Sequence, residues 1–183
     1  FLYTVTPDFP TAAEVARQLA PQSGIGDIDG VIGIDIDALV DLIRITGPMP
    51  LPEFGLTVDA TSARQLLLVD QYRVLQGRQQ RVPFLQAIGD ELGRRLTAGD
   101  VGLAKVASSL RDDIDRGGVG VWFVRPPEQA AAVTAELAPS FPRPEGHDGF
   151  IVTTQNRSPN KLDAFLRREI EYRATIDPVT GEY

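Results

Sequence analysis

Short β-branched runs alternate along the chain with longer segments whose apolar residues recur at a helical period. FLYTV, VIGIDI, VGVWFV and FIVTTQN, at residues 1–5, 31–36, 119–124 and 150–156, are typical of strands. VIGIDI and VGVWFV are almost continuously apolar, which favours strands buried on both faces. The helical period predicts helices over 11–20, 37–47, about 61–74, 81–99, 101–118 and 126–138. This order predicts the α/β class, as a layered domain with a central mixed sheet flanked by helices.

Capping residues mark the ends of two predicted helices. Thr11 is expected to cap the first helix, with Glu14 at the capping-box position. Asp37 is expected to cap the next helix and Gly47 to end it. The segment PMPLPEFG that follows, at residues 48–55, holds three prolines, and this predicts irregular structure.

The C-terminal part of the chain combines two patterns. KLDAFLR, at residues 161–167, reads as a helix, whereas the following REIEYRATID alternates polar and apolar residues as a strand does. We therefore predict one α/β domain over residues 1–165. Residues 166–183 are predicted to be the start of a following β segment or a C-terminal extension.

Composition excludes several functions. The 183 residues carry a formal net charge of −7, and the pI is near 4.7, which argues against a general nucleic-acid binder. There are no cysteines, which excludes a disulfide framework, thiolate catalysis and cysteine-bound zinc. The single histidine, His147, is interpreted as a solvated residue of a turn-rich loop. No apolar run approaches the ~18 residues of a transmembrane helix, so no membrane span is expected in this chain.

Four aspartates surround the predicted strand VIGIDI. Asp27 and Asp29 precede it, whereas Asp35 and Asp37 lie where the strand ends and the next helix begins. Ligands of open α/β sheets bind beyond the carboxyl ends of strands, so the second pair is in place for a site. The alternative is structural, with a capping Asp37 and solvated turn residues elsewhere. Of the four, Asp35 is the candidate metal ligand.

A group of arginines lies within VDQYRVLQGRQQRVPF, on either side of a glycine-containing loop. Arg73, Arg78 and Arg81 are candidate phosphate-binding residues, because arginines that converge near a helix start can bind phosphate or carboxylate through paired hydrogen bonds. The alternative is a solvated loop between helices with exposed arginines.

Three segments resemble a family of bacterial, largely actinobacterial, envelope proteins known as domain of unknown function 4012. They are TPDFPTAAEVARQL, then DGVIGIDIDALVDLIRITGPMPLPEFGLTVDATSARQLLL, and finally NRSPNKLDAFLRREIEY. The resemblance implies a membrane-anchored parent protein with this region outside the cytoplasm. The start at Phe1 and the end in DPVTGEY agree with a piece of such a parent.

A more distant resemblance concerns chemistry. DGVIGIDIDALVDLIRITGPM, LTVDATSARQLLL and GRQQRVPFLQAIGDEL are similar to segments of the LytR-CpsA-Psr phosphotransferases, which implies a LytR-CpsA-Psr-like fold. Those enzymes transfer glycopolymers from polyprenyl-pyrophosphate carriers to the cell wall, using Mg²⁺ and arginines that bind the pyrophosphate. Arg78 and Arg81 match the family's loop arginines. Where the family has an Arg-x-Arg pair, however, this chain has Asp70-Gln71-Tyr72, and the early catalytic motif would lie upstream of Phe1 or be absent.

Three functions follow as hypotheses. The first is an extracytoplasmic domain of an uncharacterised cell-envelope protein that is non-catalytic in this fragment. The second is a phosphotransferase or pyrophosphatase acting on polyprenyl-pyrophosphate-linked glycopolymers in cell-wall assembly. In that case Arg78, Arg81 and Arg73 would hold the pyrophosphate, and Asp35 or Asp70 would hold Mg²⁺. The third is an interaction module whose hydrophobic segment PMPLPEF docks a partner or lipid.

Overall fold

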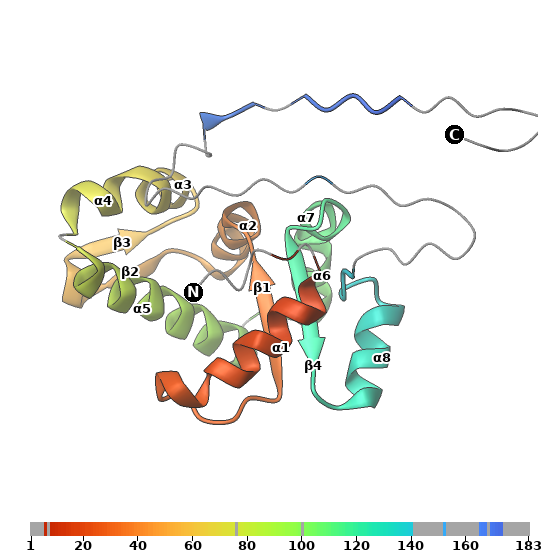
Figure 1. Ribbon diagram of the computed structural model, residues 1–183. Coiled ribbons are helices and arrows are strands. Elements are labelled where there is room, and N and C mark those ends of the chain that lie inside the picture. Colours follow the sequence, from red (N-terminus) through yellow and green to blue (C-terminus); the bar gives the residue numbers. More distant parts are fainter. Residues whose placement is uncertain are drawn as a thin grey trace, which may run out of the picture.

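The computed structural model describes residues 6, 8–75, 77–99, 101–140, 152, 165–167 and 169–173 (Figure 1). Its helices are α1 (Phe9–Leu19), the short 3₁₀ turns η2 (Pro21–Ser23) and η3 (Pro52–Phe54), α2 (Ile36–Thr46), α3 (Ala63–Gln65), the π-helical turn η4 (Leu66–Asp70), α4 (Gln71–Val74), α5 (Arg78–Thr97), α6 (Leu103–Ser109), α7 (Arg111–Asp115) and α8 (Pro126–Thr134). Its strands are β1 (Gly30–Ile34), β2 (Met49–Leu51), β3 (Leu56–Val58) and β4 (Val119–Phe123). The chain is therefore mixed α/β.

In place of one central mixed sheet, the described residues form two separate two-stranded antiparallel sheets, β1–β4 and β2–β3. The predicted strand at 1–5, and His147, lie outside the described residues, as does 150–156 apart from Val152. Of the helix predicted over 161–167, residues 161–164 lie outside the described residues and Phe165 has a 3₁₀ conformation. Residues 166, 167 and 169–173 are exposed and form neither a helix nor the strand that the pattern after the helix predicts.

The first sheet joins two distant parts of the chain. Gly33 of β1 lies opposite Gly120 of β4, and the ring of Phe9, from α1, packs over this pair. A Cβ on Gly33 would come within 2.7 Å of that ring, and one on Gly120 within 3.0 Å. The two glycines therefore let α1 lie close against one face of β1–β4 (Figure 1).

Strand β1 corrects the expectation of a strand buried on both faces. Ile32, opposite Val121, is 70% exposed, because α1 covers the other face of the pair and only β4 hydrogen-bonds to β1 among the described residues. Strand β4 is better covered, with Val119 and Val121 buried. The apolar runs therefore predicted both strands correctly, but the predicted burial of β1 on both faces was wrong.

The proline-rich segment 48–55 forms a hairpin instead of the predicted irregular structure. Strand β2 pairs with β3, and Pro50 lies opposite Thr57 at an exposed position. A proline is tolerated there because the short strand lies at a sheet edge. Gly55 supplies the left-handed turn residue, at φ +62°, that returns the chain into β3. The apolar residues Met49, Leu51 and Val58 point into the core.

The main core lies between α2, the β2–β3 hairpin, the α3–α4 segment and α5. Phe84 of α5 is fully buried at its centre, and its ring meets that of Phe54 edge-to-face with centroids 5.3 Å apart. Around it pack Leu42, Ile43, Met49, Leu51, Val58, Ala63, Leu66, Leu67, Ile88 and Leu92. Helix α5 therefore supplies the central element of this core.

Several helix ends differ from the prediction. Helix α1 begins at Phe9 with Asp8 as its cap, so Thr11 is inside the first turn and donates to the Asp8 carboxylate. Glu14 pairs with Arg17 instead of closing a capping box. The helix predicted over 101–118 divides at Leu110 into α6 and α7.

The start of α5 and the end of α8 also differ from the predicted boundaries. Helix α5 begins at Arg78, three residues before the predicted start, so Pro83 lies beyond its first turn instead of within it. Helix α8 ends at Thr134, and Glu136 then takes a left-handed conformation at φ 59°. This turn brings the carbonyl of Leu137 back to the amide of Val121, with an N–O distance of 2.7 Å.

Helix α5 offers a stabilising substitution. Gly89 and Gly93 lie inside it, and a Cβ at either position would meet no atom within 4 Å. We expect Gly89→Ala and Gly93→Ala each to raise the free energy of unfolding by about 0.5–1 kcal/mol, because alanine loses less backbone entropy in a helix. Chemical denaturation of each variant measures this, and a loss of stability would contradict the open space around both glycines.

Candidate functional site

Charged side chains from four parts of the chain meet where β1 ends. Asp35 and Asp37 come from the start of α2, Arg64 from α3, and Asp113 and Arg116 from α7 and the turn after it. We call these five residues the α2 cluster. It carries three carboxylates and two guanidinium groups, and it lies at the strand end where the sequence placed a candidate site.

Asp35 is the centre of the cluster. Its Oδ1 accepts a hydrogen bond from the amide of Ala38 at 2.9 Å, which makes Asp35 the N-cap of α2. Both carboxylate oxygens also accept from Arg116, and the Nη2–Oδ1 distance is 2.9 Å. The backbone amide of Asp35 donates to the carbonyl of Gly118 at 2.8 Å, which continues the β1–β4 ladder. One residue thus joins the sheet, α2 and Arg116.

The charges of the cluster shift each other's pKa. Burial alone would raise the pKa of the Asp35 carboxyl, but hydrogen bonds from Arg116 and Ala38 outweigh it and hold this pKa below its ordinary value of 3.8. The hydrogen bonds to Asp35 and Asp113 raise the pKa of Arg116. Both groups are therefore charged at neutral pH.

Asp37 and Asp113 complete the cluster in different ways. Asp37, expected to cap α2, lies instead in its first turn and pairs with Arg64, and its Oδ2 lies 4.0 Å from Arg116 Nη2. The cap is Asp35, two residues before the predicted one, because α2 begins at Ile36. Asp113 is only 3% exposed and pairs with Arg116 through Oδ1, whereas its buried Oδ2 has no hydrogen-bond partner among the described residues. Gly47 ends α2 as predicted.

Asp29 and Asp70 make hydrogen bonds outside this cluster. Asp29 lies just before β1, and its carbonyl accepts from the amide of Val124 at 2.8 Å. Asp70 is at the end of η4, and its Oδ1 accepts from Gln65 at 3.2 Å. Within the part of the chain that the structure describes, no group of three or more histidine, cysteine, aspartate or glutamate residues could hold a metal ion. The roles of Asp35 and Asp70 as metal ligands stay predictions.

The candidate phosphate-binding arginines lie at the corner between α4 and α5. The Arg81 guanidinium stacks on the ring of Tyr72, with 4.6 Å between its carbon and the ring centroid. Arg73 is exposed in α4, next to Tyr72. Arg78 is the first residue of α5, and its side chain is outside the described part of the structure. The stacking contact therefore places Arg81 against Tyr72, the residue next to Arg73 in the sequence.

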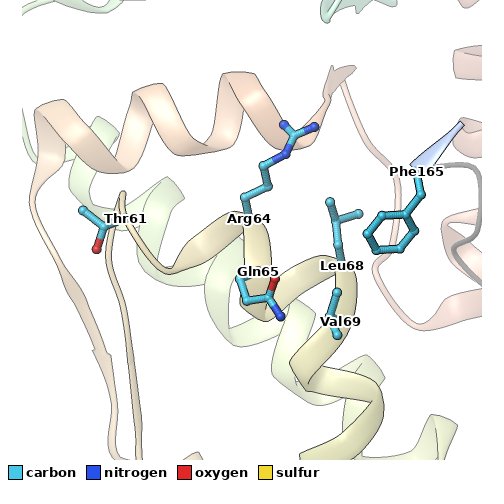
Figure 2. Close-up of a pocket in the computed structure, with 6 residues that line it drawn as sticks. All are labelled: Thr61, Arg64, Gln65, Leu68, Val69 and Phe165. Carbon is cyan, nitrogen blue, oxygen red and sulfur yellow. The ribbon is translucent and has the colours of Figure 1, made fainter. Parts of the chain in front are cut away.

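Two open hollows lie near these charged groups. One, of about 290 Å³, is lined by Arg64 together with Leu68, Val69 and Phe165, and Figure 2 shows the Phe165 ring beside Leu68. The other, of about 400 Å³, is lined by Pro50, Leu51, Pro52, Glu53, Ala87, Asp90, Glu91 and Arg94. It includes part of the PMPLPEF segment predicted to dock a partner or lipid. Its lining holds three carboxylates and one guanidinium group, and this net negative charge favours a cationic group over an anionic lipid headgroup.

A second arginine–carboxylate group connects α5 to the end of α2. Arg95 donates to the carbonyls of Thr46, Gly47 and Pro48 at 2.9 Å, and Glu91 holds both Arg94 and Arg95. Hydrogen bonds from Arg94 and Arg95 lower the pKa of Glu91 from 4.5 to about 2. Glu91 thus orients the arginine that binds the last carbonyl of α2 and the two carbonyls that follow it.

Stability is expected to fall in acid. The pKa of Glu91 is lower in the folded chain than in the unfolded chain, so the unfolded chain binds protons first as the pH falls. The stabilisation is complete above about pH 4.5 and is lost as the pH falls toward about 2. Chemical denaturation at a series of pH values should show this loss, and Glu91→Gln should make it smaller. An equally steep loss in Glu91→Gln would contradict this role.

The comparisons with known proteins give one match, in the N-terminal part of the chain. Residues 3–72 match the family model described as Protein of unknown function (DUF4012). This stretch contains Asp35, Asp37 and Arg64, whereas Asp113 and Arg116 lie beyond it. No curated protein and no solved structure matches the chain. No helix in the described residues is long and apolar enough to span a bilayer. The match over residues 3–72 supports the DUF4012 family for this chain.

Proposed function

We propose that this chain is an extracytoplasmic, non-catalytic domain of an uncharacterised bacterial, actinobacterial cell-envelope protein with a membrane-anchored parent. Two findings support the proposal. Residues 3–72 match the DUF4012 family, and the segments quoted above resemble envelope proteins of that family. The resemblance of DGVIGIDIDALVDLIRITGPM, LTVDATSARQLLL and GRQQRVPFLQAIGDEL to the LytR-CpsA-Psr enzymes supports an architecture like theirs.

The proposal that the domain is non-catalytic rests on the hydrogen bonds that the Asp35 carboxylate accepts. Both of its carboxylate oxygens accept hydrogen bonds from Arg116, and one also caps α2. These three hydrogen bonds use most of the roughly four acceptor positions of the carboxylate, which leaves it little capacity to bind a metal ion or a substrate. Arg116 also presents positive charge on the side from which a divalent cation would approach, so these residues suit Mg²⁺ poorly. The α2 cluster therefore works as a structural connection between β1, α2 and α7.

The second candidate function, a polyprenyl-pyrophosphate phosphotransferase, is favoured by one contact. Arg81 stacks on Tyr72, the sequence neighbour of the exposed Arg73, and so places a guanidinium at the α4–α5 corner. Arginines held in this way can bind phosphate through paired hydrogen bonds. This corner, and not the α2 cluster, is where a pyrophosphate would bind.

The two functions are separated by a binding and turnover experiment on the whole chain. Calorimetry with a polyprenyl phosphate, with and without Mg²⁺, measures binding, and release of the glycan from a polyprenyl-pyrophosphate glycolipid measures turnover. The non-catalytic proposal expects no turnover above the background without protein. Turnover that requires Mg²⁺ would overturn it and support the phosphotransferase.

The arginines are tested with a matched pair of variants. If the α4–α5 corner binds phosphate, Arg78→Ala/Arg81→Ala should weaken binding at least tenfold. Arg44→Ala, which removes an exposed arginine on α2, should leave binding unchanged. Equal binding by the double variant and the parent chain would remove Arg78 and Arg81 from any phosphate site.

A further inference from the structure

The α4–α5 corner has exposed apolar side chains beside its arginines. Tyr72 and Val74 of α4, together with Val82 and Leu85 of α5, are between 38% and 56% exposed. In Figure 1, α4 and the first turns of α5 lie at the left edge of the structure, away from the β1–β4 sheet. Apolar side chains gathered on one exposed surface mark a site of contact with a protein or a membrane.

Helix α5 presents part of this surface on one of its faces. Arg81 and Val82 precede Leu85 by four and three residues, so the three side chains lie on the same side of the helix. Phe84, on the neighbouring side, is buried in the core. The Arg81 guanidinium stacks on the ring of Tyr72, with 4.6 Å between its carbon and the ring centroid, and so joins α4 to this face. Aromatic, apolar and positively charged groups are therefore contiguous at the corner.

The charge of the corner is opposite to that of the whole chain. Between Asp70 and Asp90 the sequence holds three arginines and no aspartate or glutamate, whereas the whole chain carries a net charge of −7. The ion pairs within the described part of the chain include neither Arg73 nor Arg81. The first turn of α5 has no acidic residue, so the positive end of the helix dipole adds to the charge of the arginines. The corner therefore favours a negatively charged partner.

We propose that the α4–α5 corner docks on an anionic lipid bilayer. Val82 and Leu85 would enter the boundary between headgroups and acyl chains, while Arg73 and Arg81 bind headgroup phosphates through paired hydrogen bonds. The ring of Tyr72 suits the same depth, because one end of a tyrosine is apolar and the other is polar. The proposal goes beyond the function proposed above, since contact with a bilayer needs neither turnover nor a pyrophosphate.

The apolar residues select a bilayer over a soluble anion. A free phosphate would use the arginines alone and leave Val82 and Leu85 in water, whereas a bilayer buries both side chains. The net charge of the chain opposes this contact only weakly, because salt screens exposed charges over about 8 Å. Asp90, the first carboxylate along α5, lies nine residues after Arg81, which is about 14 Å along the helix axis. The lipid would therefore meet the N-terminal end of α5.

Sedimentation with vesicles tests the proposal on the whole chain. The probes are vesicles of phosphatidylcholine alone and vesicles of phosphatidylcholine and phosphatidylglycerol at a ratio of about two to one. The chain should bind the mixed vesicles about tenfold more tightly than the uncharged ones, and added salt should weaken that binding.

Two double variants separate the charged and the apolar parts of the corner. Arg73→Gln/Arg81→Gln should weaken binding to the mixed vesicles about tenfold or more, because each arginine near an anionic surface contributes about fivefold. Val82→Gln/Leu85→Gln should also weaken it about tenfold, because this variant removes the side chains that enter the bilayer.

The matched controls replace exposed residues of α7 and α8, which lie to the right in Figure 1. Arg111→Gln and Val133→Gln should each leave binding within about twofold of the parent chain, because neither residue belongs to the corner.

A fluorescent label reports which surface meets the lipid. The chain has no cysteine, so Val82→Cys and Val133→Cys each carry a single environment-sensitive label. On the mixed vesicles, emission from the label at position 82 should shift to shorter wavelength and be quenched by lipids with a nitroxide on the acyl chain. The label at position 133 should show neither effect.

Four results would overturn the proposal. The first two are equal binding to both kinds of vesicle and an equal response of the two labels. The third is binding that inorganic pyrophosphate removes and that Val82→Gln/Leu85→Gln leaves unchanged, which would assign the corner to a soluble anion. The fourth is a dimer that forms without lipid and dissociates in the same variant, which would assign the corner to a second copy. Glycolipid turnover is measured separately, so the two proposals can fail independently.

Discussion

Replacing Phe84 by alanine should lower the free energy of unfolding by about 3–5 kcal/mol. The Phe84 side chain is fully buried between α2, the hairpin and α5, and its ring makes an edge-to-face contact with Phe54. The substitution removes this buried apolar surface and leaves a cavity that a close-packed core fills only in part. Denaturant unfolding of the variant and the parent chain, followed by circular dichroism, measures the difference.

The matched control is the next residue of the same helix. Leu85 is 47% exposed, so Leu85→Ala should change the free energy of unfolding by less than about 1 kcal/mol. If the two variants lose similar amounts, Phe84 is not at the centre of the core. The loss in Phe84→Ala should also exceed that in Phe54→Ala, because Phe54 is only partly buried.

Removing Arg116 should have the second largest effect, a loss of about 2–3 kcal/mol in Arg116→Ala. Arg116 is the ion-pair partner of Asp113, whose side chain is 5% exposed, and it also holds Asp35 at the cap of α2. Without it, a buried carboxylate remains with no opposite charge. Because the Arg116 side chain is itself 41% exposed, water moderates the loss below that of a fully buried pair.

A double variant identifies the source of this loss. In the Arg116→Ala background, Asp113→Asn removes the uncompensated charge and should restore about 1 kcal/mol. Arg44→Ala is the control for the loss of an arginine, since Arg44 pairs with Asp41 at the surface of α2 and should cost less than about 0.5 kcal/mol. A loss in Arg116→Ala no larger than that in Arg44→Ala would contradict the role of the α2 cluster.

Local sequence pattern predicted most of the elements but not all of their boundaries. The apolar runs gave β1 and β4, and the helical period gave α1, α2, α5 and α8. The cap of α2 was misplaced because Asp35 and Asp37 are equally suited to capping by residue type, and contact with Arg116 favours the first. The hairpin was missed because proline content outweighed the alternation of Met49 and Leu51, which bury on one side of β2.

The sequence pointed to aspartates of the α2 cluster but not to the arginines that pair with them. The aspartates stand out in the sequence because they flank an apolar run. Their partners do not, since Arg64 is 27 residues from Asp37 and Arg116 is 81 residues from Asp35. Pairing over such distances depends on how α3 and α7 pack, which no local pattern records. The same limit applies to the exposure of Ile32, which is set by the neighbours of β1 and not by its own composition.

The pairing of β1 with β4 also has a kinetic consequence. Strand β1 follows the first helix, whereas β4 comes after α7, so this sheet closes a loop that contains the hairpin and most of the core. Closing a long loop costs chain entropy before any strand contact repays it. Folding is therefore expected to form the α2–α5 core first and the β1–β4 sheet afterwards. As the chain leaves the ribosome, the β2–β3 hairpin can therefore form as soon as β3 has been made, whereas β1 must wait for β4 before the β1–β4 pair can form.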